Sequence, residues 1–297
     1  MLPRRHIRIK VFQSLYAYSQ QHQDIDFNID AEYKSNLDAY LNSYFFIINI
    51  INHLHKLATS EININKKKFI PSKEDLNPNV RFIKNFIFQK TKNINILPNI
   101  EIDSDKLNII IKKNFKSIKK TEFYTNYMSK KSIQKVEEKK IIFHILKKYF
   151  INNEKVYDFI EEYSIYWNEN MHIAYNLFKE QINNSRPLKN VKIFRQKEDQ
   201  IFGENLLKKT IEEEKKTSKI IHKLAKNWDT ERIALSDLIL IRMAITEISH
   251  FIDVPNNVTI DEYVEISKQY SSPKSKEFIN GILDVFSKDI LSKKSTK

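Results

Sequence analysis

The sequence predicts an all-α protein. Only two glycines occur among the 297 residues, and tight hairpin turns depend on residues that tolerate positive φ, so hairpin-rich sheets are disfavoured. Apolar residues make up 41% of the chain and charged residues 29%, which is typical of folded soluble proteins and not of disordered chains. Apolar residues also recur at helical spacing along most of the sequence.

The first helix is expected from about residue 3 to residue 21. Ile7, Val11 and Leu15 recur every four residues and form one apolar stripe that should face a core. Tyr16 extends the same side, and we interpret it as a core residue rather than as a platform for base stacking.

Arginine is clustered at the start of this helix. Only eight of the fifty basic residues are arginines, and three of the eight, Arg4, Arg5 and Arg8, lie within the first eight positions. The net charge of +13 carries less weight, because the bias toward Lys, Ile and Asn is typical of A+T-rich codons. Guanidinium groups bind phosphate in a bidentate manner, so the cluster indicates a polyanionic partner. Arg4 and Arg8 share a helical line with Val11 and Leu15, so the first turns should project beyond the core and leave the arginines exposed.

The middle of the chain is expected to be helical throughout. A long apolar helix is predicted over residues 31–58, and shorter helices over residues 59–131, where prolines interrupt the pattern. Two more helices are predicted over residues 132–150 and 154–183, before a break at Arg186-Pro187.

The last third contains the most apolar segment. One helix carries Phe202 and continues toward Trp228, and the next, over residues 233–250, is apolar almost all round and should be the buried centre of its domain. We interpret Arg242 on this helix as a structural ion-pair residue, for which Glu247, Glu262 and Glu265 are the candidate partners.

Two helices complete the chain. Thr259 to Glu262 has the spacing of a capping box, and Ser272-Pro273 is typical of a cap followed by a first helical residue. Gly281 lies inside the final helix, where glycine costs roughly 0.5–1 kcal/mol relative to alanine. We interpret it as a point of close backbone approach, the alternative being a tolerated accident.

The sequence shows no catalytic machinery. It contains no cysteine, no glycine-rich nucleotide loop and no nucleophile elbow, so we predict no enzyme activity, no cofactor and no metal site. The longest apolar stretch, residues 44–51, is too short for a membrane span, and polar residues interrupt any signal peptide after the first charges. We therefore expect a cytoplasmic protein with no membrane contact.

Both ends of the chain resemble the NusB family. The opening RRHIRIKVFQSLY is similar to the family's arginine-rich start, and DLILIRMAITE, DVPNNVTIDEYVEISKQY and KSKEFINGILD are similar, in order, to its later helices and its Asp-Val-Pro loop. The resemblance covers residues 3–21 and 202–286. It implies a NusB-like helical bundle of two subdomains, enlarged here by a helical insertion after the first helix.

The resemblance also implies an organisation of the chain. An N-terminal helix with the RNA-binding start is expected over residues 1–22, the insertion over 23–197, the NusB-like core over 198–290, and a disordered basic tail over 291–297. The role of the insertion and any self-association stay open.

The function implied is transcription antitermination. Family members bind the single-stranded boxA segment of ribosomal RNA transcripts together with the ribosomal protein NusE, in a complex with RNA polymerase. The positions that match the family's RNA-binding start are Arg4, Arg5, His6 and Arg8, where His6 replaces a usual arginine, and Lys274 and Lys276 could extend the basic surface or be ordinary surface lysines. Asp237 matches an acidic position on the partner-facing surface. Structural roles are expected for Arg242, Glu247, Glu262, Phe278, Asn280 and Gly281.

Two other functions are alternatives. An RNA cytosine methyltransferase with a NusB-like domain would need a cofactor loop and catalytic cysteines, and the sequence has neither. A ribosome-assembly or helical scaffold protein would bind RNA weakly and without sequence preference, whereas an antitermination factor must prefer one short RNA.

Overall fold

The chain forms two compact helical units. The computed structural model describes residues 1–21, 27–94, 102–225 and 233–295, and the side chains as far as residue 290. One unit, here the terminal unit, comprises Met1–Asn36 and Phe194–Lys297, and the other, the central unit, comprises Leu37–Ile193. The described residues contain helices and no strand, which confirms the predicted all-α class. Within those residues no helix is both long and apolar enough to cross a membrane.

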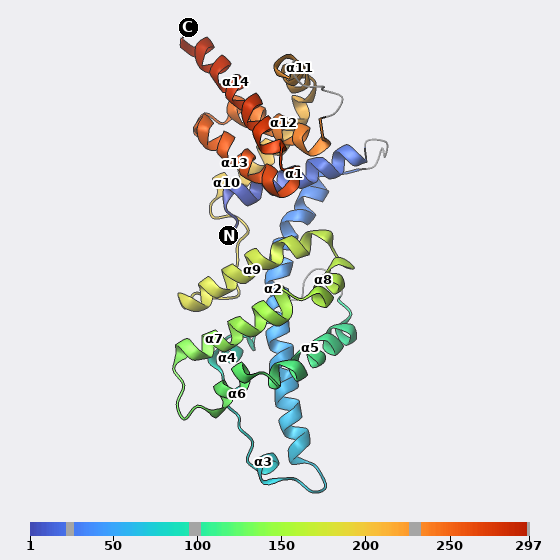
Figure 1. Cartoon of the computed structure of the whole chain (residues 1–297), viewed down its shortest axis with the longest axis vertical. Coiled ribbons are helices and arrows are strands. Elements are labelled where there is room, and N and C mark those ends of the chain that lie inside the picture. Colours follow the sequence, from blue (N-terminus) through green and yellow to red (C-terminus); the bar gives the residue numbers. More distant parts are fainter. Residues whose placement is uncertain (22–26, 95–101, 226–232, 296–297) are drawn as a thin grey trace. The chain divides into compact units, whose positions relative to one another are not determined.

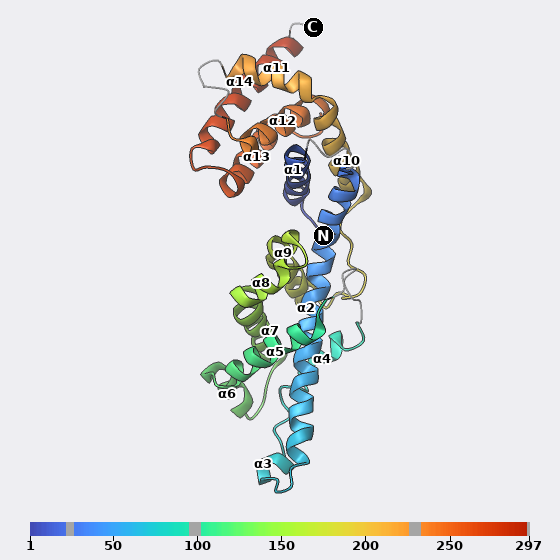
Figure 2. The ribbon, with the colours of Figure 1, turned by 90° about the vertical axis from the view of Figure 1, so that its right-hand side faces the viewer.

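The terminal unit is a bundle around one apolar helix (Figures 1 and 2). Helix α12 (Leu235–His250) packs against α1 (Arg4–Gln20), α10 (Lys197–Glu212), α11 (Glu214–Leu224), α13 (Asn256–Tyr270) and α14 (Ser275–Ser295). Most of its residues are buried, and only a few side chains such as Arg242 reach the surface. The buried position predicted for this helix is therefore confirmed.

Several helix ends in the terminal unit differ from prediction. Helix α13 begins at Asn256, so Thr259 is not an N-cap but a buried residue inside the helix. Helix α14 begins at Ser275 and continues through Ser295, so the tail expected to be disordered from residue 291 is helical that far. The helix expected to reach Trp228 is broken between α10 and α11, and Trp228 itself lies outside the described residues.

The central unit is built along one long helix. Helix α2 (Ile29–Lys66) has its first residues in the terminal unit and the rest in the central unit, and continues eight residues beyond the predicted end. The remaining elements are α3 (Lys73–Leu76), α4 (Phe86–Thr91), α5 (Ser104–Lys119), α6 (Glu122–Ser129), α7 (Lys135–Leu146), the π-helix η1 (Lys147–Ile151), α8 (Glu154–Glu161) and α9 (Ile165–Asn183). The single helix predicted over residues 154–183 is thus two.

Aromatic side chains fill the core of the central unit. Trp167 and Phe46 are almost fully buried, with ring centroids 5.7 Å apart, and Phe82 stacks on Phe115 at 5.6 Å. This one apolar cluster runs from Ala39 to Leu188 in sequence, so the central unit has a hydrophobic core of its own.

The glycine that permits a close approach is Gly203 and not Gly281. A Cβ atom on Gly203 would overlap the Tyr33 hydroxyl and lie 2.7 Å from Cγ2 of Ile7. A Cβ on Gly281 would meet nothing within 4 Å, so the interpretation of Gly281 as a packing requirement was wrong. Helix α10 can therefore approach α1 and the start of α2 because residue 203 lacks a side chain.

Candidate nucleic-acid interface

Arg4 and Arg5 lie in the first turn of α1 with their side chains partly open to solvent, at 39% and 41% exposure. The Arg4 Nε donates to Asp199 Oδ1 on α10 at 2.9 Å. The Arg5 guanidinium donates to both carboxylate oxygens of Glu262 on α13, at 2.8 Å each. These hydrogen bonds lower the pKa of the Glu262 carboxyl, so the acid stays ionised. Both arginines are thereby positioned by carboxylates while keeping free surface.

Arg8 is buried instead of exposed, which contradicts the prediction. Its side chain is 3% exposed and donates to Glu247 on α12 through Nε at 2.9 Å and through Nη2 at 2.5 Å. Its guanidinium also lies 5.0 Å from the ring of Phe202 and 6.0 Å from that of Tyr263. The prediction that Arg8 lies on the same helical line as the core residues was correct. The first turns do not project beyond the core, however, because the buried carboxylate of Glu247 meets Arg8 there.

Glu247 is the centre of this buried network. Besides the two bonds from Arg8, it accepts a hydrogen bond from the Thr259 hydroxyl at 3.0 Å and one from the Tyr263 hydroxyl at 2.9 Å. Each carboxylate oxygen therefore has two donors, which compensates for burial of the charge. Burial opposes the charged form of Arg8, but the hydrogen bonds and the charge of Glu247 outweigh it and raise the pKa of Arg8.

His6 lies beside the arginines and is half-buried. Burial, with the neighbouring charges of Lys10 and Arg5, lowers the pKa of its imidazole, and no described residue bonds to its buried Nδ1 atom. His6 is therefore neutral at pH 7 and offers ring surface and hydrogen-bonding atoms rather than a positive charge.

These residues line a pocket in the terminal unit. It encloses about 560 Å³ between the first turns of α1 and the loop that leads into α13. Sequence reasoning missed that this loop forms the opposite wall, although the Asp-Val-Pro motif was the available signal. The residues that line the pocket are Pro3, Arg4, Arg5, His6, Arg8, Asp253, Val254, Pro255, Val258 and Glu262.

Lys274 and Lys276 are exposed, as predicted, but neither is among the described residues that line this pocket. They flank Ser275, whose hydroxyl donates to Asp237 at 2.7 Å. The Asp237 carboxylate also accepts from Ser271 and is only 6% exposed. Asp237 thus differs from the expected partner-facing acid, since its carboxylate joins the start of α12 to the α13–α14 connection.

The other structural predictions had mixed outcomes. Arg242 does form an ion pair, but with Glu214 at 2.7 Å rather than with the three expected acids. Glu262 binds Arg5, and Phe278 is partly buried at the start of α14. Asn280 is exposed and donates to Asp284 at 3.2 Å. Tyr16 is 39% exposed, so its assignment to the core was wrong.

The described residues contain no cluster of three or more His, Cys, Asp or Glu side chains that could hold a metal ion. The arrangement that they do contain is a concave surface with two half-exposed guanidinium groups and a neutral imidazole. Such a surface can pair with phosphates and present polar atoms to bases. Fold and site together define an all-helical protein with an arginine-lined pocket at the start of its first helix, where each arginine is paired with a carboxylate.

The chain belongs to the NusB family, whose family model matches residues 136–288. This match begins inside the segment predicted as an insertion and does not include α1. The chain is 43% identical over 89 residues to the transcription antitermination protein NusB of Salinibacter ruber, an alignment that covers 30% of the chain and 56% of the relative. It is 44% identical over 88 residues to the protein of that name from Thermodesulfovibrio yellowstonii, which covers 30% and 58%.

The chain thus spans somewhat more than half the length of these curated relatives. No solved structure matches it.

Proposed function

We propose that this protein is a transcription antitermination factor that binds boxA-like single-stranded RNA of ribosomal RNA transcripts together with the ribosomal protein NusE. The observation that carries the proposal is the pair Arg4 and Arg5, held half-exposed at the mouth of a pocket. Membership of the NusB family supports the choice of RNA and of partner. Contact with RNA polymerase would follow within the antitermination complex.

The burial of the three arginines supports two different proposed roles for them. Arg8 is enclosed by Glu247 and two aromatic rings, so it supports the pocket from within and does not reach phosphate. Arg4 and Arg5 would bind phosphate, in part by exchanging their present carboxylate partners, and His6 would contact a base or sugar. Lys274 and Lys276 stay proposed as secondary contacts on the same unit.

The test measures binding of a boxA-like RNA and a scrambled RNA across a salt series, with and without NusE. The variant Arg4→Ala/Arg5→Ala removes two phosphate contacts, so the slope of log affinity against log salt should become shallower by about 1.4, at about 0.7 per phosphate on single strands. Arg186→Ala is the matched control, because Arg186 is also an exposed arginine bound to a carboxylate, Glu180 at 2.9 Å.

A boxA preference that NusE strengthens and that only the double variant loses would support the proposal. Equal affinity for both RNAs, unchanged by NusE and by the substitutions, would overturn it in favour of a scaffold with non-specific RNA binding.

A further inference from the structure

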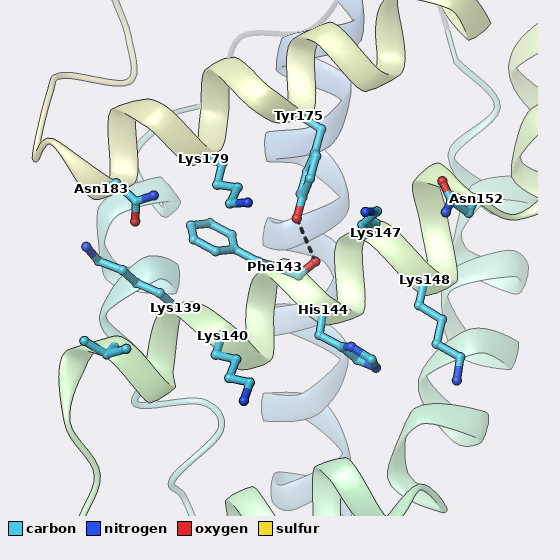
Figure 3. Close-up of a pocket in the computed structure, with 11 residues that line it drawn as sticks. Lys139, Lys140, Phe143, His144, Lys147, Lys148, Asn152, Tyr175, Lys179 and Asn183 are labelled. Carbon is cyan, nitrogen blue, oxygen red and sulfur yellow. Dashed lines mark hydrogen bonds between the residues drawn. The ribbon is translucent and has the colours of Figure 1, made fainter.

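The central unit carries a second cationic surface, on the outer side of α7, η1 and α9. A groove of about 900 Å³ lies there, between the lysine-rich face of α7–η1 and the later part of α9 (Figure 3). Five lysines line it, namely Lys139, Lys140, Lys147, Lys148 and Lys179. No acidic side chain is among the residues that form the groove.

The groove gathers five lysines on one surface that no acidic side chain lines. None of the five lysines forms an ion pair with any residue in the described ranges, although lysines elsewhere in the unit, such as Lys106 with Glu162 and Lys119 with Glu61, do. The nearby acids are engaged elsewhere: Glu137 binds Lys130, and Glu180 binds Arg186. Glu137 still interacts with the charge of Lys140, but no acid in the described ranges lies within ion-pair distance of the five lysines, so the groove keeps a net positive charge.

The titration of His144 reflects the same field. His144 lies on α7 among the lysines, and its pKa is lowered by burial and by the charges of Lys148 and Lys140. Burial is the larger cause, and the smaller part due to the two lysines indicates a positive field, which favours anions.

An aromatic side chain lies between the lysines. Phe143 is half-buried in the groove, and Figure 3 shows its ring between Lys139 and Lys179. The Tyr175 hydroxyl donates to the Phe143 carbonyl at 3.1 Å, and the rings of Tyr175 and Phe178 meet the Phe143 ring edge-on at 6.4 Å and 6.3 Å. The Phe143 ring is therefore held in place by its neighbours.

The backbone also departs from the α-helix at this surface. In η1 the Asn152 N–H donates to the Lys147 carbonyl at 3.0 Å, which closes a π-helical turn. Such turns are rare in proteins overall, but those that do occur are often found at functional sites. Here the π-helical turn carries Lys147 and Lys148.

We infer that this groove of α7, η1 and α9 is a second binding site, for single-stranded RNA, with the lysines on the phosphates and Phe143 as a stacking surface. Single-stranded nucleic acids are bound in this way, by a cationic groove with interspersed aromatic rings. An acidic peptide would pair with the lysine charges but would have no base to stack on the Phe143 ring. Only the choice of RNA over DNA rests on the proposed function of the terminal unit.

The experiment uses the full chain and a labelled oligouridine, which contains no boxA-like segment. The groove variant is Lys140→Gln/Lys147→Gln/Lys148→Gln/Lys179→Gln. The control variant is Lys67→Gln/Lys112→Gln/Lys116→Gln/Lys120→Gln, which removes four equally exposed lysines of the same unit that lie outside the groove. All eight side chains are exposed, so both variants should fold, as circular dichroism would verify.

The groove variant should bind oligouridine on the order of tenfold or more weakly, with a salt slope shallower by about 3, and the control variant should stay close to wild type. A second variant, Phe143→Leu, should weaken binding roughly tenfold without changing the salt slope, because it removes a stacking surface and no charge.

Wild-type binding by the groove variant, or an equal loss in the control variant, would overturn the inference. Equal competition by oligoglutamate, with no effect of Phe143→Leu, would also overturn it, in favour of an acidic protein partner. Because oligouridine lacks the boxA-like sequence and Arg4 and Arg5 are unchanged, failure here is distinguishable from failure of the proposed function.

Discussion

At the scale of single residues, Glu247 is the side chain on which the terminal unit depends most. It has no solvent exposure and four hydrogen-bond donors, from Arg8, Thr259 and Tyr263. Glu247→Gln would leave the buried Arg8 charge with only the Glu262 carboxylate, 3.8 Å away, so we expect a loss of roughly 3–5 kcal/mol in the stability of the terminal unit. Thermal unfolding followed by circular dichroism would measure it.

Glu262→Gln is the control for that substitution. Glu262 also binds an arginine, but it is 20% exposed and Arg5 is 41% exposed, so water screens that pair, and Glu262 lies farther from the buried Arg8, at 3.8 Å, than Glu247 does. The expected cost is below about 1 kcal/mol. Similar losses for the two variants would contradict the special importance of the buried network.

His6 predicts a pH dependence. Its folded-state pKa lies below the ordinary histidine value of 6.5, so in mildly acidic solution the unfolded chain binds a proton that the folded chain does not. Stability should therefore fall as the pH decreases from neutral through 6.5 toward the lower folded-state pKa. His6→Gln should reduce the difference between melting temperatures at pH 7 and at pH about 5.5. An unchanged difference would show that other groups cause it.

At the scale of helices, the two glycines should respond oppositely to alanine. Gly203→Ala would push a methyl group against Tyr33 and Ile7, and overpacking of this kind typically costs about 1–3 kcal/mol. Gly281→Ala has open space and removes the helix penalty of glycine, so it should stabilise by roughly 0.5–1 kcal/mol. The melting temperature should fall for Gly203→Ala and rise for Gly281→Ala, relative to wild type. A shift of both melting temperatures in the same direction would contradict the packing described.

The class of the fold and most helices were predictable, because they follow from local patterns. The apolar circumference of α12 indicated its central position, and the apolar stripe of α1 indicated its buried face. The ends were less predictable: α13 begins after Pro255 without a side-chain cap, so the capping-box spacing at Thr259 pointed to the wrong residue.

The arginine cluster was predictable, but the separate roles of its members were not. Arg4, Arg5 and Arg8 look alike in sequence, and what distinguishes them is which acid each one meets. Those acids lie 195, 257 and 239 residues away in the chain, a separation at which no local pattern helps. The lysine groove could not be predicted for the opposite reason, because lysine is common throughout and only the fold shows where lysines gather on one surface.

At the scale of the whole molecule, the central unit should fold alone. It is one continuous segment, and its aromatic cluster draws only on residues within it. We expect a fragment of residues 37–193 to melt cooperatively. Its one tryptophan, Trp167, is 1% exposed, so its fluorescence should be blue-shifted and move to longer wavelength on melting. Emission typical of solvent-exposed tryptophan in the intact fragment would contradict an independent core.

The division of the terminal unit between the two ends of the chain has a consequence for synthesis on the ribosome. Arg8 leaves the ribosome 239 residues before Glu247, and at about 5–20 residues per second this interval lasts roughly 12–48 seconds. During that time the apolar face of α1 and its arginine have no completed bundle to join, and all of the central unit is made before the interval ends. The segment in the middle is therefore free to fold first, and the nascent first helix is the part of the chain that would most need protection by a chaperone.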